Sequence, residues 1–480
     1  DYSALLFLGG RYQVRSSAIG EKGPQVTPCR MTGASNLISV IFRNWRAKIV
    51  APILFGIGLV STFAGQLALS HVTTAADFGI YILIYNAAAV LSALGAAGYD
   101  LTAVRFVANA LNRKDNSYIH SYLRHAVKMS GALALIAAAL MLAYLAGTVG
   151  LNWPILGLAL LVTLLWSWSR LAAGILRGLD RLSFALISDR VSRDFLVMLL
   201  AISALLLTTA VPIHMALLIL AIGSLFGIVI GSAVSRQYLR SAAQRQRDDA
   251  DDVLPALTPA EPGLWLLASL GLLAYNIAEL LSSRFDVFAL SYLSTAEAVG
   301  AFGLGLLLIN LVTIPSGFIT MLLMPAVAIA HHDGDRARLR RLFVLSTSAS
   351  FATGICIAAV LAFLMPYLDR FLPPATVASL RPELLGLAIG VRVLCLIGTF
   401  PPVLLMMAGG HRQLILAHAA SIAVRVILFV AFGAIVDANF AILTFVAGTV
   451  VVTALNLWQV LPGLFKGQGE DRKPSSPLQD

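Results

Sequence analysis

The sequence predicts an all-α polytopic membrane protein, and three observations carry this prediction. The chain is 59% hydrophobic and 12% charged, with a mean hydropathy of +0.85, whereas soluble proteins carry about 25% charged residues. Its apolar runs reach the roughly 20 residues that a helix needs to cross a bilayer. Its basic residues lie in short loops, not in one basic domain, so the sequence pI near 9.7 indicates the lipid bilayer, and no nucleic acid, as a partner.

Twelve apolar stretches, taken in order, are expected to span the membrane. They are 49–70, 78–99, 126–148, 154–174, 185–208, 213–235, 264–292, 298–328, 342–366, 383–408, 413–436 and 440–462. Two are irregular, because 185–208 carries four charges near its start and 298–328 is interrupted by Pro315. Pro315, and Pro401 with Pro402 in the tenth stretch, serve either helix packing or a functional bend.

Loop charge gives these stretches a direction. Of the 34 Lys and Arg residues, 29 fall in the tails, in one alternate set of loops or at the ends of the stretches that flank those loops, whereas the other set of loops holds only Arg370 and Arg381. Basic loops stay on the cytoplasmic side, so both termini are expected in the cytoplasm. Residues 1–30 contain no methionine and no apolar signal core, and we expect the native chain to start at or near Met31.

Weak internal similarity divides the chain into two halves. The outer loop Thr74–Tyr81 resembles Thr295–Phe302, and the inner loop Arg177–Arg181 occupies the same place as Ala408–Arg412. Such a repeat predicts two pseudo-repeated six-helix bundles, an organisation typical of transporters. The expected parts are a cytoplasmic tail 1–48, a first bundle 49–235, a cytoplasmic linker 236–263, a second bundle 264–462 and a cytoplasmic tail 463–480.

The seventh stretch, Gly263–Leu293, carries a polar stripe. Asn276, Glu279, Ser283 and Asp286 follow an i, i+3, i+7, i+10 spacing, which places them on one face of a helix. An acid near mid-membrane costs about 2.5–3.5 kcal/mol, so it normally faces a protein interior or a watery cavity. We therefore expect these four residues to line a cavity and to serve coupling, with Glu279 taking up a proton.

Three arginines within the stretches lie close to acids in the sequence. Arg190 and Arg193 lie at i, i+4 spacing from Asp194 and Asp189, so they either form structural pairs or line the rim of a cavity. Arg284 lies near the outer end of its stretch, where a snorkelling role is favoured.

Two further arginines have no acid within four residues. Arg392 and Arg425 lie well inside their stretches, so their partner must be another helix or a ligand. We expect either an interhelical ion pair, with Glu279 as the counter-ion, or a binding site for an anion, because arginine matches phosphate oxygens well.

Motifs for catalysis and metal binding are missing from the sequence. The chain has no GxxxxGK[ST] loop and no HExxH, GxSxG or CxxC motif, so we expect no catalytic residues, no metal and no cofactor beyond an ion or proton gradient. Cys29, Cys356 and Cys395 have no ligand or disulfide spacing. The group His331–Asp335 is interpreted as a solvated loop and not as a metal site.

Two segments carry a resemblance to a known family. Residues 75–108 (AADFGIYILIYNAAAVLSALGAAGYDLTAVRFVA) and 284–328, which begin RFDVFALSYLSTAEAVGAFG, resemble polysaccharide biosynthesis flippases of the Wzx type. These flippases belong to the multidrug/oligosaccharidyl-lipid/polysaccharide (MOP) exporter superfamily, and the resemblance covers residues 45–462. It implies a V-shaped pair of six-helix bundles around a central cavity. Related lipid II flippases have arginines in the first two spans, which are absent here, so another glycan is expected.

The resemblance implies a function and a substrate. The implied function is the movement of undecaprenyl-diphosphate-linked oligosaccharide from the cytoplasmic to the periplasmic leaflet of the bacterial inner membrane. The movement occurs by alternating access and serves O-antigen or other polysaccharide synthesis. The candidate substrate-binding residues are Arg190, Arg193, Arg392 and Arg425. Polysaccharide polymerase machinery is a further expected partner.

Two alternative functions stay open. A small-cation drug exporter of the same superfamily should have an acid-rich cavity, whereas five arginines accompany four acids here. A membrane glycosyltransferase or polymerase is disfavoured by the short outer loops.

Overall fold

The described part of the chain is helical throughout. The computed structural model describes residues 45–113, 115–150, 152–248, 262–433 and 436–465, and these contain no strand. The first half comprises α3 (Trp45–Val72), α4 (Ala75–Gly95), α5 (Tyr99–Asn112), α6 (Asn116–Thr148), α7 (Trp153–Gly178), α8 (Leu182–Leu186), the π-helical turn η1 (Ile187–Val191), α9 (Ser192–Leu206) and α10 (Ile213–Asp248).

The second half begins at α11. It comprises α11 (Pro262–Leu293), α12 (Ala296–Leu311), α13 (Ile314–His332), α14 (Arg336–Leu364), η2 (Met365–Tyr367), α15 (Leu368–Phe371), α16 (Pro374–Ser379), α17 (Pro382–Leu394), η3 (Cys395–Gly398), α18 (Pro401–Met407), α19 (His411–Ala431) and α20 (Ala438–Phe465). The expected linker 236–263 is therefore helical up to Asp248 and again from Pro262. Residues 1–30 lie outside the described residues.

The number of spanning helices differs from the twelve expected. Within the described ranges, ten helices are long and apolar enough to cross a membrane, and the bent pair α12–α13 gives up to eleven. The remaining expected span, 185–208, consists of α8, η1 and α9, none of which is long enough by itself. The π-helical turn η1, which contains Asp189 and Arg190, separates α8 from α9 and so accounts for the difference.

Several spans break where the sequence removes or strains backbone hydrogen bonds. The axis bends by 50° between α12 and α13, just before Pro315, whose ring cannot donate a backbone hydrogen bond. The α-helix of the tenth expected span gives way to the 3₁₀ turn η3, two residues before Pro401. α4 gives way to α5 at Gly98, whose φ of 73° is accessible to glycine at little cost.

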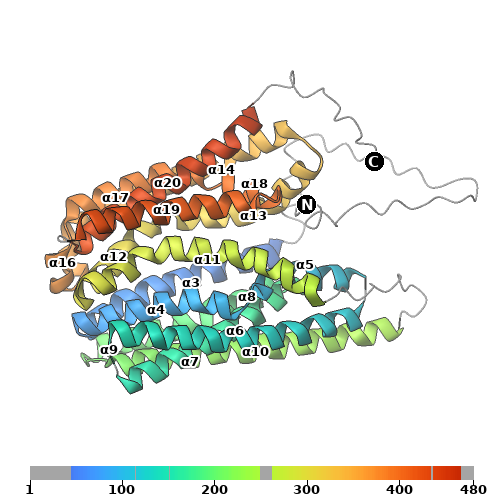
Figure 1. Ribbon diagram of the computed structural model, residues 1–480, viewed down its shortest axis with the longest axis horizontal. Coiled ribbons are helices and arrows are strands. Elements are labelled where there is room, and N and C mark those ends of the chain that lie inside the picture. Colours follow the sequence, from blue (N-terminus) through green and yellow to red (C-terminus); the bar gives the residue numbers. More distant parts are fainter. Residues whose placement is uncertain (1–44, 114, 151, 249–261, 434–435, 466–480) are drawn as a thin grey trace, which may run out of the picture.

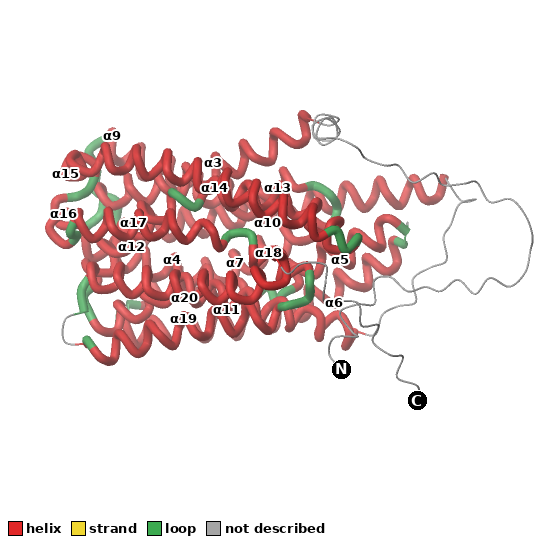
Figure 2. Tube along the Cα trace, turned by 90° about the horizontal axis from the view of Figure 1, so that it is seen from above, coloured by secondary structure: helices red, strands yellow, loops and turns green. Residues whose placement is uncertain are grey.

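The two halves converge at one end of the molecule and diverge at the other. We call the end with the 72–75 and 293–296 connections the outer end, because these loops are expected outside, and the opposite end the inner end. Figure 1 shows the ribbons of the two halves close together at the outer end, on the left, and splayed apart toward the right. In the perpendicular view the helices run roughly parallel to one another (Figure 2).

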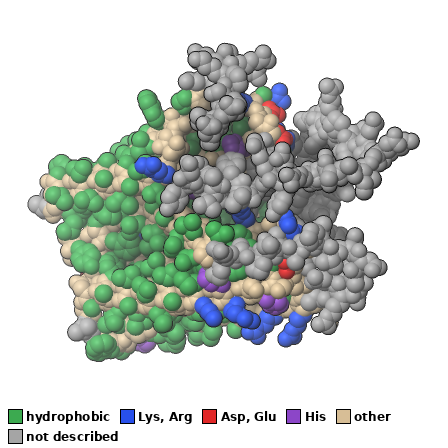
Figure 3. Space-filling view, turned by 45° about the vertical axis from the view of Figure 1, so that its right-hand side comes forward, with side chains coloured by type: hydrophobic (Ala, Val, Ile, Leu, Met, Phe, Trp, Pro, Cys, Tyr) green, Lys and Arg blue, Asp and Glu red, His purple; other side chains and the backbone are tan. Residues whose placement is uncertain are grey.

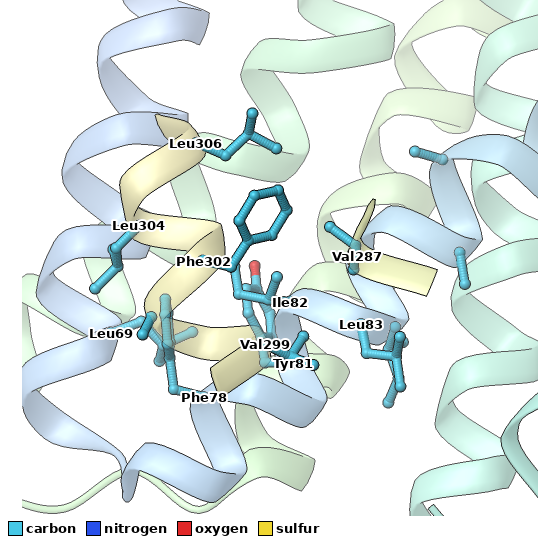
Figure 4. Close-up of a cluster of buried hydrophobic side chains, with 14 of the residues drawn as sticks. Leu69, Phe78, Tyr81, Ile82, Leu83, Val287, Val299, Phe302, Leu304 and Leu306 are labelled. Carbon is cyan, nitrogen blue, oxygen red and sulfur yellow. The ribbon is translucent and has the colours of Figure 1, made fainter. Parts of the chain in front are cut away.

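Close packing of α4 against α12 joins the halves at the outer end. Phe78, Tyr81 and Ile82 of α4 are buried together with Val299 and Phe302 of α12, among other side chains (Figure 4). A Cβ atom at Gly79 would overlap the carbonyl oxygen of Ala296. The glycine therefore allows a helix-to-helix approach that any larger residue would prevent.

The surface supports a membrane setting. Large apolar side chains are exposed on α6, α14 and α19, including Leu135, Phe363 and Val430, which is 80% exposed. Figure 3 shows hydrophobic side chains interspersed with uncharged atoms over the left of the view, whereas most visible Lys and Arg side chains lie in its centre and right. An apolar surface of this extent is expected to face lipid.

Candidate functional site

Asp286 and Arg425 form a buried ion pair within the second half. Nη1 of Arg425 (α19) lies 2.7 Å from Oδ2 of Asp286 (α11), and the side chains are 2% and 1% exposed. Thr444 of α20 donates a hydrogen bond of 2.8 Å to the other carboxylate oxygen. Arg425 also donates to the carbonyl oxygens of Ser282 (2.5 Å) and Phe445 (3.3 Å). These contacts tie three helices together.

The expectation that Glu279 is the counter-ion of Arg425 is wrong. Asp286 takes that place, because it lies two turns further along α11, level with Arg425 on α19. Glu279 is exposed, and Tyr275, one turn earlier, interacts with its carboxylate. A buried arginine with an acid and two carbonyl acceptors has the contacts of a structural group, and substrate binding by Arg425 stays a prediction.

Arg392 has no acidic partner among the described residues. Its Nη2 lies 3.3 Å from Oδ1 of Asn310 (α12) and its Nη1 lies 3.5 Å from Oγ1 of Thr449 (α20). Its guanidinium stands 5.5 Å from the centre of the Phe445 ring, and its Nε is buried without a hydrogen-bond partner. The guanidinium therefore retains a positive charge that no neighbouring carboxylate neutralises.

The first half holds a second buried ion pair, on α9. Nε of Arg193 lies 2.9 Å from Oδ1 of Asp194, and both side chains are 4% exposed. Thr62 of α3 donates a 2.6 Å hydrogen bond to the same carboxylate. The Arg193 guanidinium lies 3.6 Å from the centre of the Trp166 ring, a cation–π distance.

The i, i+4 pairs expected in this region are wrong. Asp189 pairs with Arg177 of α7 at 3.2 Å, and Arg193 pairs with its immediate neighbour Asp194. The cause is the π-helical turn Ile187–Val191, whose wider turn rotates the following residues out of the α-helical i, i+4 relation.

Arg190 thereby forms no ion pair within the described structure, and it lies near Arg284, which also forms none. The Arg190 guanidinium stands 5.3 Å from the centre of the Phe55 ring. Arg284 of α11 interacts electrostatically with three charged groups, Arg170, Arg190 and Glu279. The nearest donor–acceptor contact of Arg284 is with Ser283, at 3.0 Å, and its Nε is buried without a partner. Basic side chains from both halves therefore gather around α11.

A comparison with family models matches residues 56–329 to a family described as polysaccharide biosynthesis proteins. This match covers more than half of the 480 residues. The chain belongs to this family. The match confirms the resemblance predicted from the sequence, and no curated protein matches the chain.

Solved structures show that this polysaccharide biosynthesis protein has the fold of MOP transporters. An inward-facing multidrug resistance MATE family transporter of the MOP superfamily has a TM-score of 0.58 at 13% identity, covering 86% of this chain and 94% of that chain. The lipid II flippase MurJ, in an inward closed conformation, has a TM-score of 0.56 at 13% identity and covers 87% of each chain. An outward-facing MATE transporter has a TM-score of 0.54 at 16% identity.

The polar stripe of α11 divides into two sets in this family member. Asn276 and Asp286 are buried against neighbouring helices, whereas Glu279 and Ser283 are exposed. The buried pair lies toward the two edges of the stripe, where packing helices cover it. The cavity-lining and coupling roles expected for these residues stay predictions.

The sequence analysis missed two groups near the arginine cluster. Arg170 of α7 lies inside the expected span 154–174 but was not singled out, and its Nη2 lies 3.3 Å from Oδ2 of the buried Asp100 on α5. The hydroxyl of Tyr85 (α4) lies 3.4 Å from Oδ1 of Asp194, and Tyr85 also interacts electrostatically with Arg284. The polar residue Asn86 beside Tyr85 in an apolar run was the available signal, but no spacing connects residues so distant in sequence.

Proposed function

We propose that the protein is a flippase that moves an undecaprenyl-diphosphate-linked oligosaccharide across the membrane by alternating access. The observation that supports this most is that three arginines, Arg190, Arg284 and Arg392, form no ion pair within the described residues. A diphosphate is anionic, and the planar guanidinium donates paired hydrogen bonds to phosphate oxygens. The large polar sugar cannot enter hydrocarbon unaided, so it needs a polar path between the halves.

The arrangement of the two halves fits the cytoplasmic loading step of this cycle. The halves are packed together at the outer end and diverge at the inner end. In the proposed inner-membrane orientation, with both termini cytoplasmic, a lipid-linked glycan would enter from the cytoplasm. Polysaccharide polymerase machinery is the proposed consumer on the other side.

One observation favours a second candidate, the export of small organic cations. Glu279 is an exposed acid that forms no ion pair within the described structure, and Arg284 and Arg170 are the basic residues near it. A cation would be attracted to this carboxylate, but it would also meet Arg284 and Arg170 nearby. The excess of arginine makes an anionic head group the better match.

A transport assay in vesicles tests the proposal. Purified protein is reconstituted with undecaprenyl-diphosphate-linked oligosaccharide, and glycan exposed on each leaflet is measured by a sugar-degrading enzyme added outside. Arg190→Ala and Arg284→Ala should each reduce flipping at least about tenfold, since a charge-assisted hydrogen bond contributes about 1.5–3 kcal/mol.

The matched control is Arg370→Ala, an exposed arginine on α15 that is remote from the cluster. This variant should flip at the parental rate. Normal flipping by both cluster variants at normal abundance would contradict the proposal, and transport of organic cations in place of the glycan would favour the second candidate.

A further inference from the structure

An apolar cavity lies between the two halves, toward the outer end. It has a volume of about 480 Å³, within the range of about 300–1,000 Å³ that is usual for ligand sites. α3 contributes Phe63 and Leu67 from the first half, and residues of α12, α14, α15 and α17 line most of the remaining wall from the second half. Its wall carries no charged side chain, so the cavity is suited to hydrocarbon alone.

The cavity borders the expected lipid face. Toward the outer end, His71 at the end of α3 contacts the carbonyl oxygen of Phe371 (α15) through Nε2, at 2.9 Å, and so connects the two halves there. Val360 and Cys356 of α14 line the cavity and are exposed, with Val360 57% exposed. A hydrocarbon chain can therefore enter sideways from the bilayer without crossing water.

The apolar cavity continues into a smaller, more polar one. Phe63, Leu307 and Leu311 line both cavities, and the second has a volume of about 240 Å³. Asn310 lines the second cavity and accepts a hydrogen bond from Arg392. The two spaces together form one amphipathic path, with hydrocarbon walls at one end and an unneutralised arginine behind the other.

We infer that the apolar cavity holds the isoprenoid chain of the lipid-linked substrate. The inference rests on the proposed function and adds where the chain is bound during transport. An occupant must have a long apolar part beside an anionic group, because the Arg392 charge lies where the apolar walls end. A polyprenyl diphosphate has both parts, joined in that order. The isoprenoid chain thereby stays between α3 and α14 while the sugar passes between the two halves of the protein.

Thiol labelling tests chain binding in the native sequence. The protein is placed in phospholipid nanodiscs, and labelling of Cys356 and Cys395 by a membrane-permeant maleimide is read separately by mass spectrometry. Undecaprenol and undecaprenyl diphosphate should both slow labelling of Cys356 several-fold, whereas inorganic pyrophosphate should not. Cys395 does not line the cavity but lies beside Arg392, so it is the internal reference for undecaprenol, which has no diphosphate and should leave Cys395 labelling unchanged.

A pair of variants on one helix tests whether the cavity itself is needed. Ile357 lines the cavity, whereas Ile355 on α14 is 55% exposed and does not. Ile357→Trp fills the space and should weaken undecaprenyl diphosphate binding at least about tenfold. Ile355→Trp should leave it unchanged.

The outcomes separate this inference from the proposed function. Unchanged Cys356 labelling with undecaprenol, even if the diphosphate lipid is flipped, would overturn the chain site alone, and would point to phospholipid chains as the occupant. Equal binding by the two tryptophan variants would overturn it as well. Protection by undecaprenol with no gain in affinity from the diphosphate would support the chain site and count against the proposed function.

Discussion

At the scale of single residues, the ion pair between Asp286 and Arg425 is expected to determine stability. Arg425→Ala leaves a carboxylate buried without its partner, which costs about 3–5 kcal/mol. The melting temperature in detergent should fall, and less protein should accumulate in the membrane. Asp286→Leu combined with Arg425→Met should recover most of the loss, because neither charge then remains buried.

The measurement also decides the role of Arg425. If Arg425→Ala melts and accumulates like the parent protein but no longer flips substrate, then the side chain binds the substrate, as the sequence had suggested. Loss of stability that the double replacement restores would identify a structural pair.

Glu279 gives a second prediction at this scale. It is exposed, and Tyr275 and Arg284 of its own helix are among its polar neighbours. Glu279→Gln removes the proton-binding group and keeps the shape, so flipping should lose its dependence on a pH gradient while affinity for undecaprenyl diphosphate changes by less than about twofold. Flux and affinity are measured in the same vesicles. An unaltered response to the gradient would exclude Glu279 as the coupling acid.

At the scale of helices, the α4–α12 contact is expected to control outer closure. Gly79→Val places atoms where the Ala296 carbonyl lies, so α12 must move away. Ile82 is 1% exposed. In a protein without native cysteines, a cysteine introduced by Ile82→Cys should react with an impermeant maleimide from outside only when Gly79→Val is also present. The control is Gly157→Val on α7, where a Cβ meets nothing within 4 Å. Reaction that is equally slow in both variants would show that closure does not depend on this contact.

Also at this scale, the sequence predicts helices better than it predicts their interruptions. Apolar length alone located most spans, because a bilayer requires it. The π-helical turn at Ile187–Val191 escaped prediction, since no local pattern marks it and its neighbours, among them Arg177 and Gly227, come from other helices. The pairing of Asp286 with Arg425 escaped for the same reason, because a contact between residues so far apart in sequence has no local spacing.

At the scale of the whole molecule, orientation in the membrane is the main prediction. Ser241 lies near the inner end of α10 and Asn152 precedes α7 at the outer end, and both are exposed. In intact cells, Asn152→Cys should react with an impermeant thiol reagent and Ser241→Cys should react only after the cells are broken. The opposite pattern would invert the topology and place the divergent end of the molecule outside.

The contacts of α11 have a mechanical consequence. This helix is fastened to the first half near both of its ends, through Trp265 with Tyr118 and through Ser291 with Tyr144. Between those points it is fastened to the second half through Asp286. The contact of α11 with the second half therefore lies between its two contacts with the first half. A rotation of one half against the other that keeps all three contacts must therefore bend α11, and a rotation that keeps the helix straight must break one of them.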